Sequence, residues 1–256
     1  MSFVVNPYRF GAGAACTGTA WDGYGASSVK ENGAAFNLNA GSDASLDDIW
    51  DGGATVSIWV YIESDGASNT GRILDKRTNE VGSAGWFLLT ANEAAGECDL
   101  RFNQDFSTTA HRVITTDPIT LNAWHHVAVS YNSDSSANSA IIHIDGTKME
   151  VGSGLTEELT ASGTRTSDAA RSFLIGNTDF SFIRNFDGSV CECRVYDSIL
   201  DDATITCLSS GHDEATGLVS YWRLNPVENA NYLLDEVGSN DMTANAAASN
   251  TDGPGD

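Results

Sequence analysis

The sequence predicts an all-β protein: an antiparallel two-sheet jelly-roll sandwich with one short capping helix. Apolar runs of five to nine residues recur along the 256 residues, and several of them alternate between apolar and polar positions with period two. Clusters of Gly, Asn, Asp and Ser separate the runs, and the chain has only 4 prolines to interrupt them. Short runs rich in Val, Ile, Phe, Trp and Tyr between turn-forming clusters are typical of such sandwiches.

The predicted strands are these apolar runs. In chain order they cover residues 54–62, 85–91, 98–103, 111–116, 124–131, 140–145, 172–177, 189–197 and 217–224. The run at 140–145 ends in Asp145-Gly146, a dipeptide that favours a tight turn between two antiparallel strands. We therefore expect the segment after Gly146 to run back antiparallel to 140–145.

Residues 200–211 carry a helical pattern instead of an alternating one. Asp201 or Asp202 can act as the N-cap, because a carboxylate accepts a hydrogen bond from a free N–H of the first turn. Ile205 and Leu208 lie at helical spacing, and Gly211 is suited to end the helix. We expect a short helix that caps an open end of the sandwich.

Three of the five histidines lie in the predicted hairpin formed by 124–131 and 140–145. His125 and His126 are adjacent on one strand, so their side chains point to opposite faces of the sheet. They cannot bind one metal ion together.

The hydrophobic pattern fits a register in which Tyr131 pairs with Ala140. The core-facing pairs are then Val127 with Ile144 and Val129 with Ile142. On the other face His126 lies opposite Asp145, with His143 diagonal to it. Two imidazoles and one carboxylate could hold zinc, but no fourth group or spacing motif accompanies them. We interpret these histidines as parts of the sheet.

The charge of the chain excludes several partners. Lys and Arg total 13 against 35 Asp and Glu, which gives a formal charge of −22 at pH 7. So negative a surface repels nucleic acid and anionic lipid, and it favours cation binding and a salty medium. No apolar run approaches the ~20 residues that a membrane helix needs, so we expect no membrane partner.

The cysteines and the first residues bear on where the chain folds. Cys191 and Cys193 are two apart on one predicted strand, too far apart for a relaxed disulfide, so we expect buried free thiols. Free thiols indicate a reducing cytoplasm. The stretch "MSFVVNPYRFGAG" lacks the basic start and apolar core of a secretory signal. We expect synthesis in a cytoplasm without a signal peptide.

Several segments resemble laminin-G-like domains of the concanavalin A-like lectin/glucanase group. "AWHHVAVSY" followed by "IIHIDG" resembles a pair of adjacent strands in that family. The segments "ATVSIWVYI", "FLIGN", "CECRVYDSILDDATITCL" and "GLVSYWRLN" resemble further family elements in the same order. The resemblance covers 34–240 and implies a concanavalin A-like jelly roll. It leaves 1–33 as an N-terminal arm that docks on the sandwich or a neighbour, and 241–256 as a flexible C-terminal tail.

The hydrolase branch of this family carries three acids on one strand, as E-x-D-x-x-E or E-x-D-x-E. The nearest match is the run that begins at Glu97 and Asp99, where Arg101 and Phe102 occupy the positions of the third acid. Around Glu192 no second acid shares the strand face. Retaining hydrolysis needs two carboxyls ~5 Å apart, so we interpret the protein as non-catalytic and keep a glycoside hydrolase as the least favoured alternative.

The pentraxin branch implies calcium as a cofactor. Its motifs resemble "DKRTNE" at 75–80 and "GNTD" at 176–179. Carried over position by position, the candidate ligands are Asn79, Glu80, Asn177 and Asp179, with Asp75 nearby. Their oxygen donors suit calcium, although the second loop is shorter than the family pattern and lacks its Glu-Gln pair. The alternative is that these Asn and Asp residues form turns and the protein has no cofactor.

Two functions from different classes remain open besides the hydrolase. The first is a structural protein on the surface of a virion, as a bacteriophage capsid-decoration, tail or fibre component. It would associate with other virion proteins or with itself, and a trimer would suit capsid or fibre symmetry. The second is a stand-alone lectin that binds glycans through exposed aromatic side chains, for which the candidates are Trp50, Trp86 and Phe106.

Overall fold

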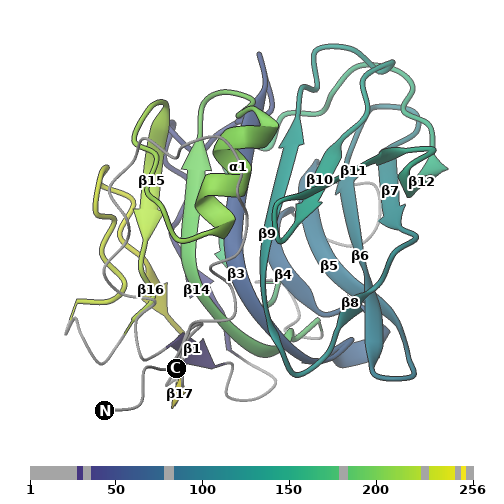
Figure 1. Ribbon diagram of the computed structural model, residues 1–256. Helices are drawn as coiled ribbons and strands as arrows, with labels where there is room; N and C mark the ends of the chain where they lie inside the picture. The colour runs from purple at the N-terminus through teal and green to yellow at the C-terminus, as the bar shows by residue number, and fades with distance from the viewer. Residues whose placement is uncertain are drawn as a thin grey trace.

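The computed structural model describes residues 28–30, 36–77, 84–178, 184–225, 231–245 and 249–251. Two antiparallel sheets pack against each other (Figure 1). The first sheet contains β1 (Ser28–Lys30), β3 (Ala54–Ser64), β9 (Trp124–Tyr131), β10 (Ile141–Ile144), β11 (Thr147–Val151), β14 (Asp187–Tyr196), β15 (Leu218–Trp222) and β17 (Ser249–Thr251). The second contains β2 (Leu38–Asn39), β4 (Arg72–Arg77), β5 (Gly85–Ala94), β6 (Glu97–Gln104), β7 (His111–Thr115), β8 (Ile119–Thr120), β12 (Gly154–Leu159), β13 (Leu174–Ile175) and β16 (Thr243–Ala244).

The strand order within each sheet follows from the pairings. The first sheet runs β11–β10–β9–β3–β14, and the far edge of β14 pairs first with β1 and then, farther along, with β15, while β17 lies beyond β1. The second runs β16–β2–β13–β4–β5–β6–β7–β12, and β8 pairs with the beginning of β6. β11 and β12 pair in parallel and join the two sheets at one edge. The predicted β sandwich is confirmed.

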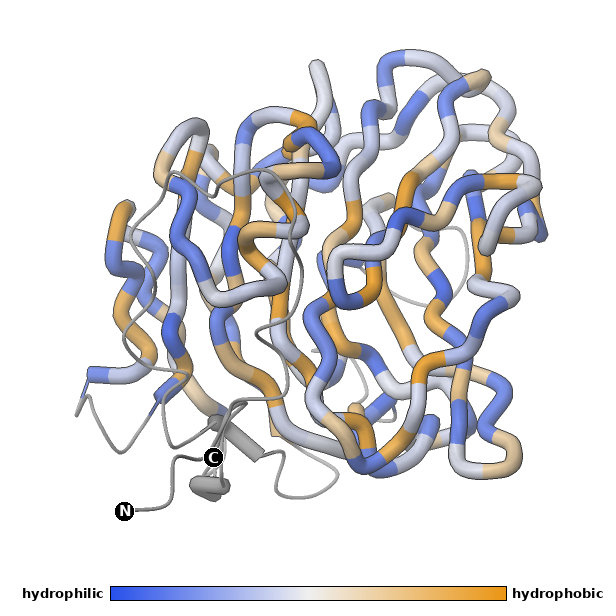
Figure 2. The backbone as a smooth tube through the Cα atoms, viewed as in Figure 1, coloured by the Kyte–Doolittle hydropathy of each residue, from blue (hydrophilic) through white to orange (hydrophobic). Residues whose placement is uncertain are grey.

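The core fills the space between the sheets. Alternate residues of β3, Val56, Ile58 and Val60, point into it, and they meet Leu88 and Leu100 of the second sheet in one hydrophobic cluster. Figure 2 shows hydrophobic and hydrophilic positions alternating along the strands of both sheets. This is the period-two pattern from which the strands were predicted.

The register of the β9–β10 hairpin agrees with the prediction. Val129 pairs with Ile142, and Val127 pairs with Ile144. The Asp145 side chain accepts hydrogen bonds from the backbone N–H of His126 at 2.9 Å and makes a 2.7 Å contact with His125 Nδ1. Among the described residues, no group of three or more His, Cys, Asp and Glu side chains is arranged to hold a metal ion.

The predicted helix is α1 (Asp202–Ser209), and Asp201 is its N-cap. The Asp201 carboxylate accepts a hydrogen bond from the N–H of Thr204 at 2.7 Å, and both Ile205 and Leu208 are buried. Its position differs from the predicted open end. The helix packs against β9 and its Asp202 contacts the outward-facing His143, so it covers the outer face of the first sheet. In the part of the chain that is described, no helix has the length and apolar character needed to cross a bilayer.

The cysteines divide into two kinds. Cys191 and Cys193 are buried free thiols, as predicted, and so is Cys98. Cys207 is disulfide-bonded. The cysteines therefore no longer support the prediction that the chain folds in a reducing cytoplasm, because disulfides persist in oxidising surroundings.

Parts of the predicted terminal segments belong to the sheets. Residues 28–30, from the predicted arm at 1–33, form β1 and pair with β14. Of the predicted tail at 241–256, residues 243–244 form β16 beside β2, and residues 249–251 form β17 beside β1. For these described residues the prediction of a flexible tail is wrong, because their backbones complete sheet edges that polar composition does not reveal.

His126 points to the outer face of the first sheet and is buried. Among the described residues, neither of its ring nitrogens has a hydrogen-bond partner. Burial, with the charge of Arg194 nearby, lowers the pKa of His126 to about 3. An unfolded chain protonates this imidazole below pH ~6.5, whereas the folded chain does not. The free energy of unfolding is therefore unaffected by this histidine above pH ~6.5. It decreases as the pH falls from ~6.5 toward 3, because the unfolded chain gains a proton that the folded chain does not.

We expect His126→Leu to reduce the acid sensitivity of the fold. Between pH 7.5 and pH 5 the free energy of unfolding should fall by about 2 kcal/mol less in the variant than in the native chain, at roughly 1.4 kcal/mol per pH unit. Urea unfolding at both pH values measures this difference, and each protein serves as its own reference. An equal decrease in the free energy of unfolding in the two proteins would contradict the lowered pKa of His126.

Candidate functional site

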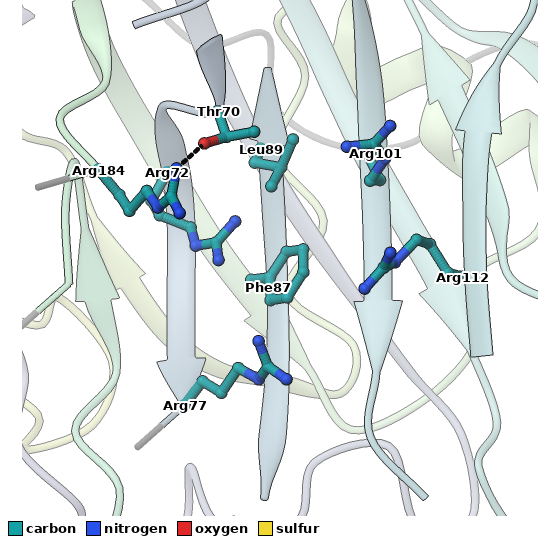
Figure 3. Close-up of a pocket in the computed structure, with 8 residues that line it drawn as sticks. All are labelled: Thr70, Arg72, Arg77, Phe87, Leu89, Arg101, Arg112 and Arg184. Atoms are coloured by element: carbon teal, nitrogen blue, oxygen red, sulfur yellow. Dashed lines mark hydrogen bonds between the residues drawn. The ribbon is translucent and has the colours of Figure 1, made fainter. Parts of the chain in front are cut away.

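The outer face of the second sheet carries a hollow of about 190 Å³. Its lining consists of Thr70, Arg72, Arg77, Phe87, Leu89, Arg101, Arg112 and Arg184 (Figure 3). Five of these eight residues are arginines, in a chain that has only 13 Lys and Arg among 256 residues. We call this feature the arginine hollow.

The strand register gathers most of these side chains. Four adjacent strands, β4 to β7, pair in sequence, so side chains in register point to the same face. The register pairs are Arg72 with Leu89, Leu89 with Arg101, Phe87 with Asn103, and Asn103 with Arg112. The hollow is therefore built from outward positions of strands whose inward positions form the core.

Phe87 and Leu89 form the floor of the hollow beneath the guanidinium groups. Their exposed fractions are 3% and 2%. The Arg72 guanidinium carbon lies 3.7 Å from the centre of the Phe87 ring, and that of Arg77 lies 5.2 Å from it. Attraction between a cation and the ring face holds both groups in place. The hollow therefore presents N–H donors to solvent above an apolar floor.

Two of the arginines are held by buried acids. Arg72 Nε lies 2.9 Å from Asp75 Oδ2, with both side chains buried. Arg77 donates two hydrogen bonds to Asp105, at 2.8 Å and 3.2 Å. Asp105 fixes the Arg77 guanidinium plane, since two N–H donors match its two carboxylate oxygens, whereas Asp75 provides a counter-charge beside the Arg72 Nε.

The other arginines have different partners. Arg101 forms a two-point ion pair with Glu158, at 2.7 Å and 2.9 Å, near the edge of the sheet. Arg184 donates to the Thr70 hydroxyl at 2.5 Å (Figure 3). Arg112 donates through Nε to the Asn103 amide oxygen at 3.1 Å, and no described carboxylate forms an ion pair with it.

The positive charge of Arg112 is partly buried and lies near other positive charges. Burial lowers its pKa, and the positive charges of Arg101 and Arg77 lower it further, while Glu158 acts in the opposite direction. Like charges and desolvation both disfavour the charged form of a base. The hollow therefore holds positive charge that the surrounding residues do not fully compensate.

Trp50, Trp86 and Phe106 do not have the exposed positions that the sequence suggested. Their exposed fractions are 1%, 1% and 7%. The rings of Trp50 and Trp86 meet edge to face, with centroids 5.1 Å apart inside the core. The prediction of sugar-stacking platforms at these positions is wrong, because neighbouring Asp and Gly residues marked loops that the sandwich closes over.

The predicted calcium residues are only partly described. Asn79, Glu80 and Asp179 lie outside the described residues. Asp75 and Asn177 belong to the second sheet and to the turn that follows β13. Whether the five come together at one sheet edge stays a prediction.

The two described members already use their oxygens. Asp75 Oδ2 pairs with Arg72, and its Oδ1 accepts the backbone N–H of Arg77 at 3.1 Å. Asn177 Oδ1 accepts the backbone N–H groups of Thr178 at 2.9 Å and Arg184 at 3.1 Å. Calcium needs six to eight oxygen donors, and a neighbouring guanidinium opposes a divalent cation, so these two residues fit a calcium site poorly.

The acids considered for hydrolysis are not arranged for it. Glu97 is exposed at the start of β6, and Asp99 accepts a hydrogen bond from Asn92 at 2.8 Å. Glu192 is buried in the other sheet, 2.7 Å from Arg194 Nη2, and burial raises its pKa to about 7. Glu97 and Asp99 share β6 of the second sheet, whereas Glu192 lies in β14 of the first sheet.

Sequence reasoning missed the arginine hollow. A signal existed, since Arg101 and Arg112 stand at polar positions of successive predicted strands, and Arg72 and Arg77 precede them in a chain poor in basic residues. Arg184 could not have been assigned, because it reaches the hollow from a distant segment. Only the sheet pairing shows that these positions meet.

Comparisons with known proteins bear on this geometry. A laminin G-type family model, described as the concanavalin A-like lectin/glucanases superfamily, matches residues 31–206. No curated protein matches the sequence. A heptameric SAP-like pentraxin from Limulus polyphemus superposes with a TM-score of 0.58 at 12% identity, over 90% of this chain and 97% of the pentraxin.

A second solved structure is a putative carbohydrate binding protein from Bacteroides ovatus. It superposes with a TM-score of 0.58 at 16% identity, over 89% of this chain. This chain spans 60% of the length of that protein. At such identities the two likenesses show a shared fold.

We expect Asp75→Asn to destabilise the hollow and the sheet around it. Removing the carboxylate leaves the buried Arg72 without this counter-charge, at a cost of about 3–5 kcal/mol in the free energy of unfolding. Glu158→Gln is the matched control, because its pair with Arg101 is partly exposed and should cost less than about 1 kcal/mol. Urea unfolding measures both, and equal costs would refute the structural role of the buried pair.

Proposed function

Since the chain belongs to the concanavalin A-like lectin/glucanases superfamily, we propose that it is a non-catalytic carbohydrate-binding module whose site is the arginine hollow. The fold alone does not fix this function, because it hosts unrelated activities. The proposal is carried by one observation: five guanidinium groups line one hollow on the face of the second sheet.

The hollow has the features that sugar recognition needs. Hydroxyl groups are bound by hydrogen-bond donors held in fixed directions, and each guanidinium supplies up to five N–H groups. Asp75, Asp105 and Phe87 hold Arg72 and Arg77 before any ligand arrives, so little side-chain freedom is lost on binding. The volume of about 190 Å³ is smaller than the roughly 300–1,000 Å³ of pockets that enclose drug-sized ligands, and it suits a single sugar ring.

The acids around the hollow support binding without catalysis. Asp75, Asp105 and Glu158 each pair with an arginine of the lining. A hydrolase needs one carboxyl to donate a proton and a second to attack or to activate water. Each of these three carboxylates is paired with a guanidinium of the lining, so we assign all three the role of positioning arginines.

We expect a glycan array to detect binding that depends on the hollow. Arg101→Ala should weaken binding about tenfold or more, because it removes a charged hydrogen-bond donor worth roughly 1.5–3 kcal/mol. Arg101 is partly exposed, so this change should leave the fold intact. Arg223→Ala, at a half-exposed arginine that follows β15, is the matched control and should bind as the native chain does.

The array also has outcomes that count against the proposal. No retained glycan, or binding that is equally strong in Arg101→Ala, would exclude the hollow as a saccharide site. Release of new reducing ends from a bound glycan would refute the non-catalytic assignment.

We propose further that the module is displayed on a virion surface as a homo-oligomer. The support is the charge of −22, which keeps particles dispersed and is screened in salty media. A saccharide-binding surface there would contact host or environmental glycans. Mass spectrometry of purified particles should detect the chain at structural-protein abundance, and its absence from particles in a culture that makes it would refute this location.

A further inference from the structure

We infer that the arginine hollow selects a saccharide that carries a carboxylate or sulfate group, and that this group binds Arg112. The inference rests on the proposed saccharide binding and adds the charge class of the ligand. Its basis is the unequal pairing of the guanidinium groups in the hollow.

Three arginines of the hollow already have carboxylate partners. Arg72, Arg77 and Arg101 pair with Asp75, Asp105 and Glu158, at 2.9 Å, 2.8 Å and 2.7 Å. These pairs neutralise their own charges. They form the walls of the site and keep few donors for an anion.

Arg112 differs from these three. Its Nε donates to the neutral amide oxygen of Asn103 at 3.1 Å, and no described residue accepts a hydrogen bond from its Nη1 or Nη2 groups. These two groups offer parallel N–H donors, the arrangement that a carboxylate or sulfate accepts at two oxygens. Asn103 fixes the guanidinium from behind, so the arginine is oriented before the ligand binds.

The electrostatics of the empty hollow favour an incoming anion. Burial lowers the pKa of Arg112, and Arg101 and Arg77 lower it further as neighbouring positive charges, while Glu158 and Asp105 act in the opposite direction. A bound carboxylate or sulfate would replace lost hydration and offset this repulsion. A neutral sugar would supply hydrogen bonds but no compensating charge.

The acidic surface does not cancel this preference. The chain carries a formal charge of −22, but exposed charges farther than about 8 Å are screened at physiological salt. The hollow itself is lined by five guanidinium groups. The hollow is thus a positively charged region on a protein whose overall charge is negative, and the surface around it repels anions.

Matched pairs of ligands that differ in charge test the inference by calorimetric titration of the full chain. One pair is sialyllactose and lactose, and another is oligogalacturonate and its methyl ester; sodium sulfate tests the anion without a sugar. We expect the charged member of at least one pair to bind about tenfold to one hundredfold more tightly, as a charged hydrogen bond allows. Arg112→Gln should abolish this preference, and Arg223→Gln should retain it.

Each outcome separates the inference from the function on which it rests. Equal affinity for the two members of every pair would refute the inference and leave saccharide binding standing. Sulfate binding with no saccharide binding would refute the proposed function and the saccharide part of the inference together. No binding of any probe would refute both.

Folding of the variant is checked separately. Because Arg112 lies among like charges, Arg112→Gln should keep or raise the melting temperature. Arg112→Lys keeps the charge and loses the two-point fork, so it should retain only part of the preference. A lysine variant that discriminates as well as the native chain would show that Arg112 acts as a point charge and not through a fork.

Discussion

The pairing register of β4 to β7 is the constraint on which the fold and the site both depend. Side chains alternate along a strand, so one register sends Trp86 and Leu88 into the core and Phe87 and Leu89 to the outer face. A slip of one residue would reverse both sets at once. The hydrophobic core therefore fixes the arginine hollow, because the same backbone pairing positions both.

The hollow illustrates how a sheet can hold several cations close together. Each guanidinium would repel the others, and burial would add a desolvation cost. Asp75 and Asp105 offset this for Arg72 and Arg77, and the Phe87 ring supports both from below. Arg112 lacks such a carboxylate. A buried charge that lacks a counter-charge lowers the stability of a fold. Such residues are often found at binding sites, where a ligand supplies the missing charge.

The outer faces of the two sheets differ in how far they are covered. The outer face of the first sheet is covered by α1, and its polar residues, such as His126 and Glu192, are buried. The outer face of the second sheet stays open at the hollow. The likeness to a pentraxin and to a carbohydrate binding protein concerns the fold, whereas the arginine hollow is formed by residues of this chain.

The sequence by itself did not predict β4 or β12, but it determined nine of the strands and the β9–β10 register, and it limited the N-cap of α1 to Asp201 or Asp202. Each of these depends on neighbours along the chain, such as the alternation around Val129 or the short reach from Asp201 to Thr204. Tertiary structure alone decided that Trp50 is buried, that residues 243–244 complete a sheet edge, and that Arg184 joins Arg112 in one hollow. These outcomes depend on which strands pair across long stretches of sequence. Local composition and spacing carry no record of that pairing.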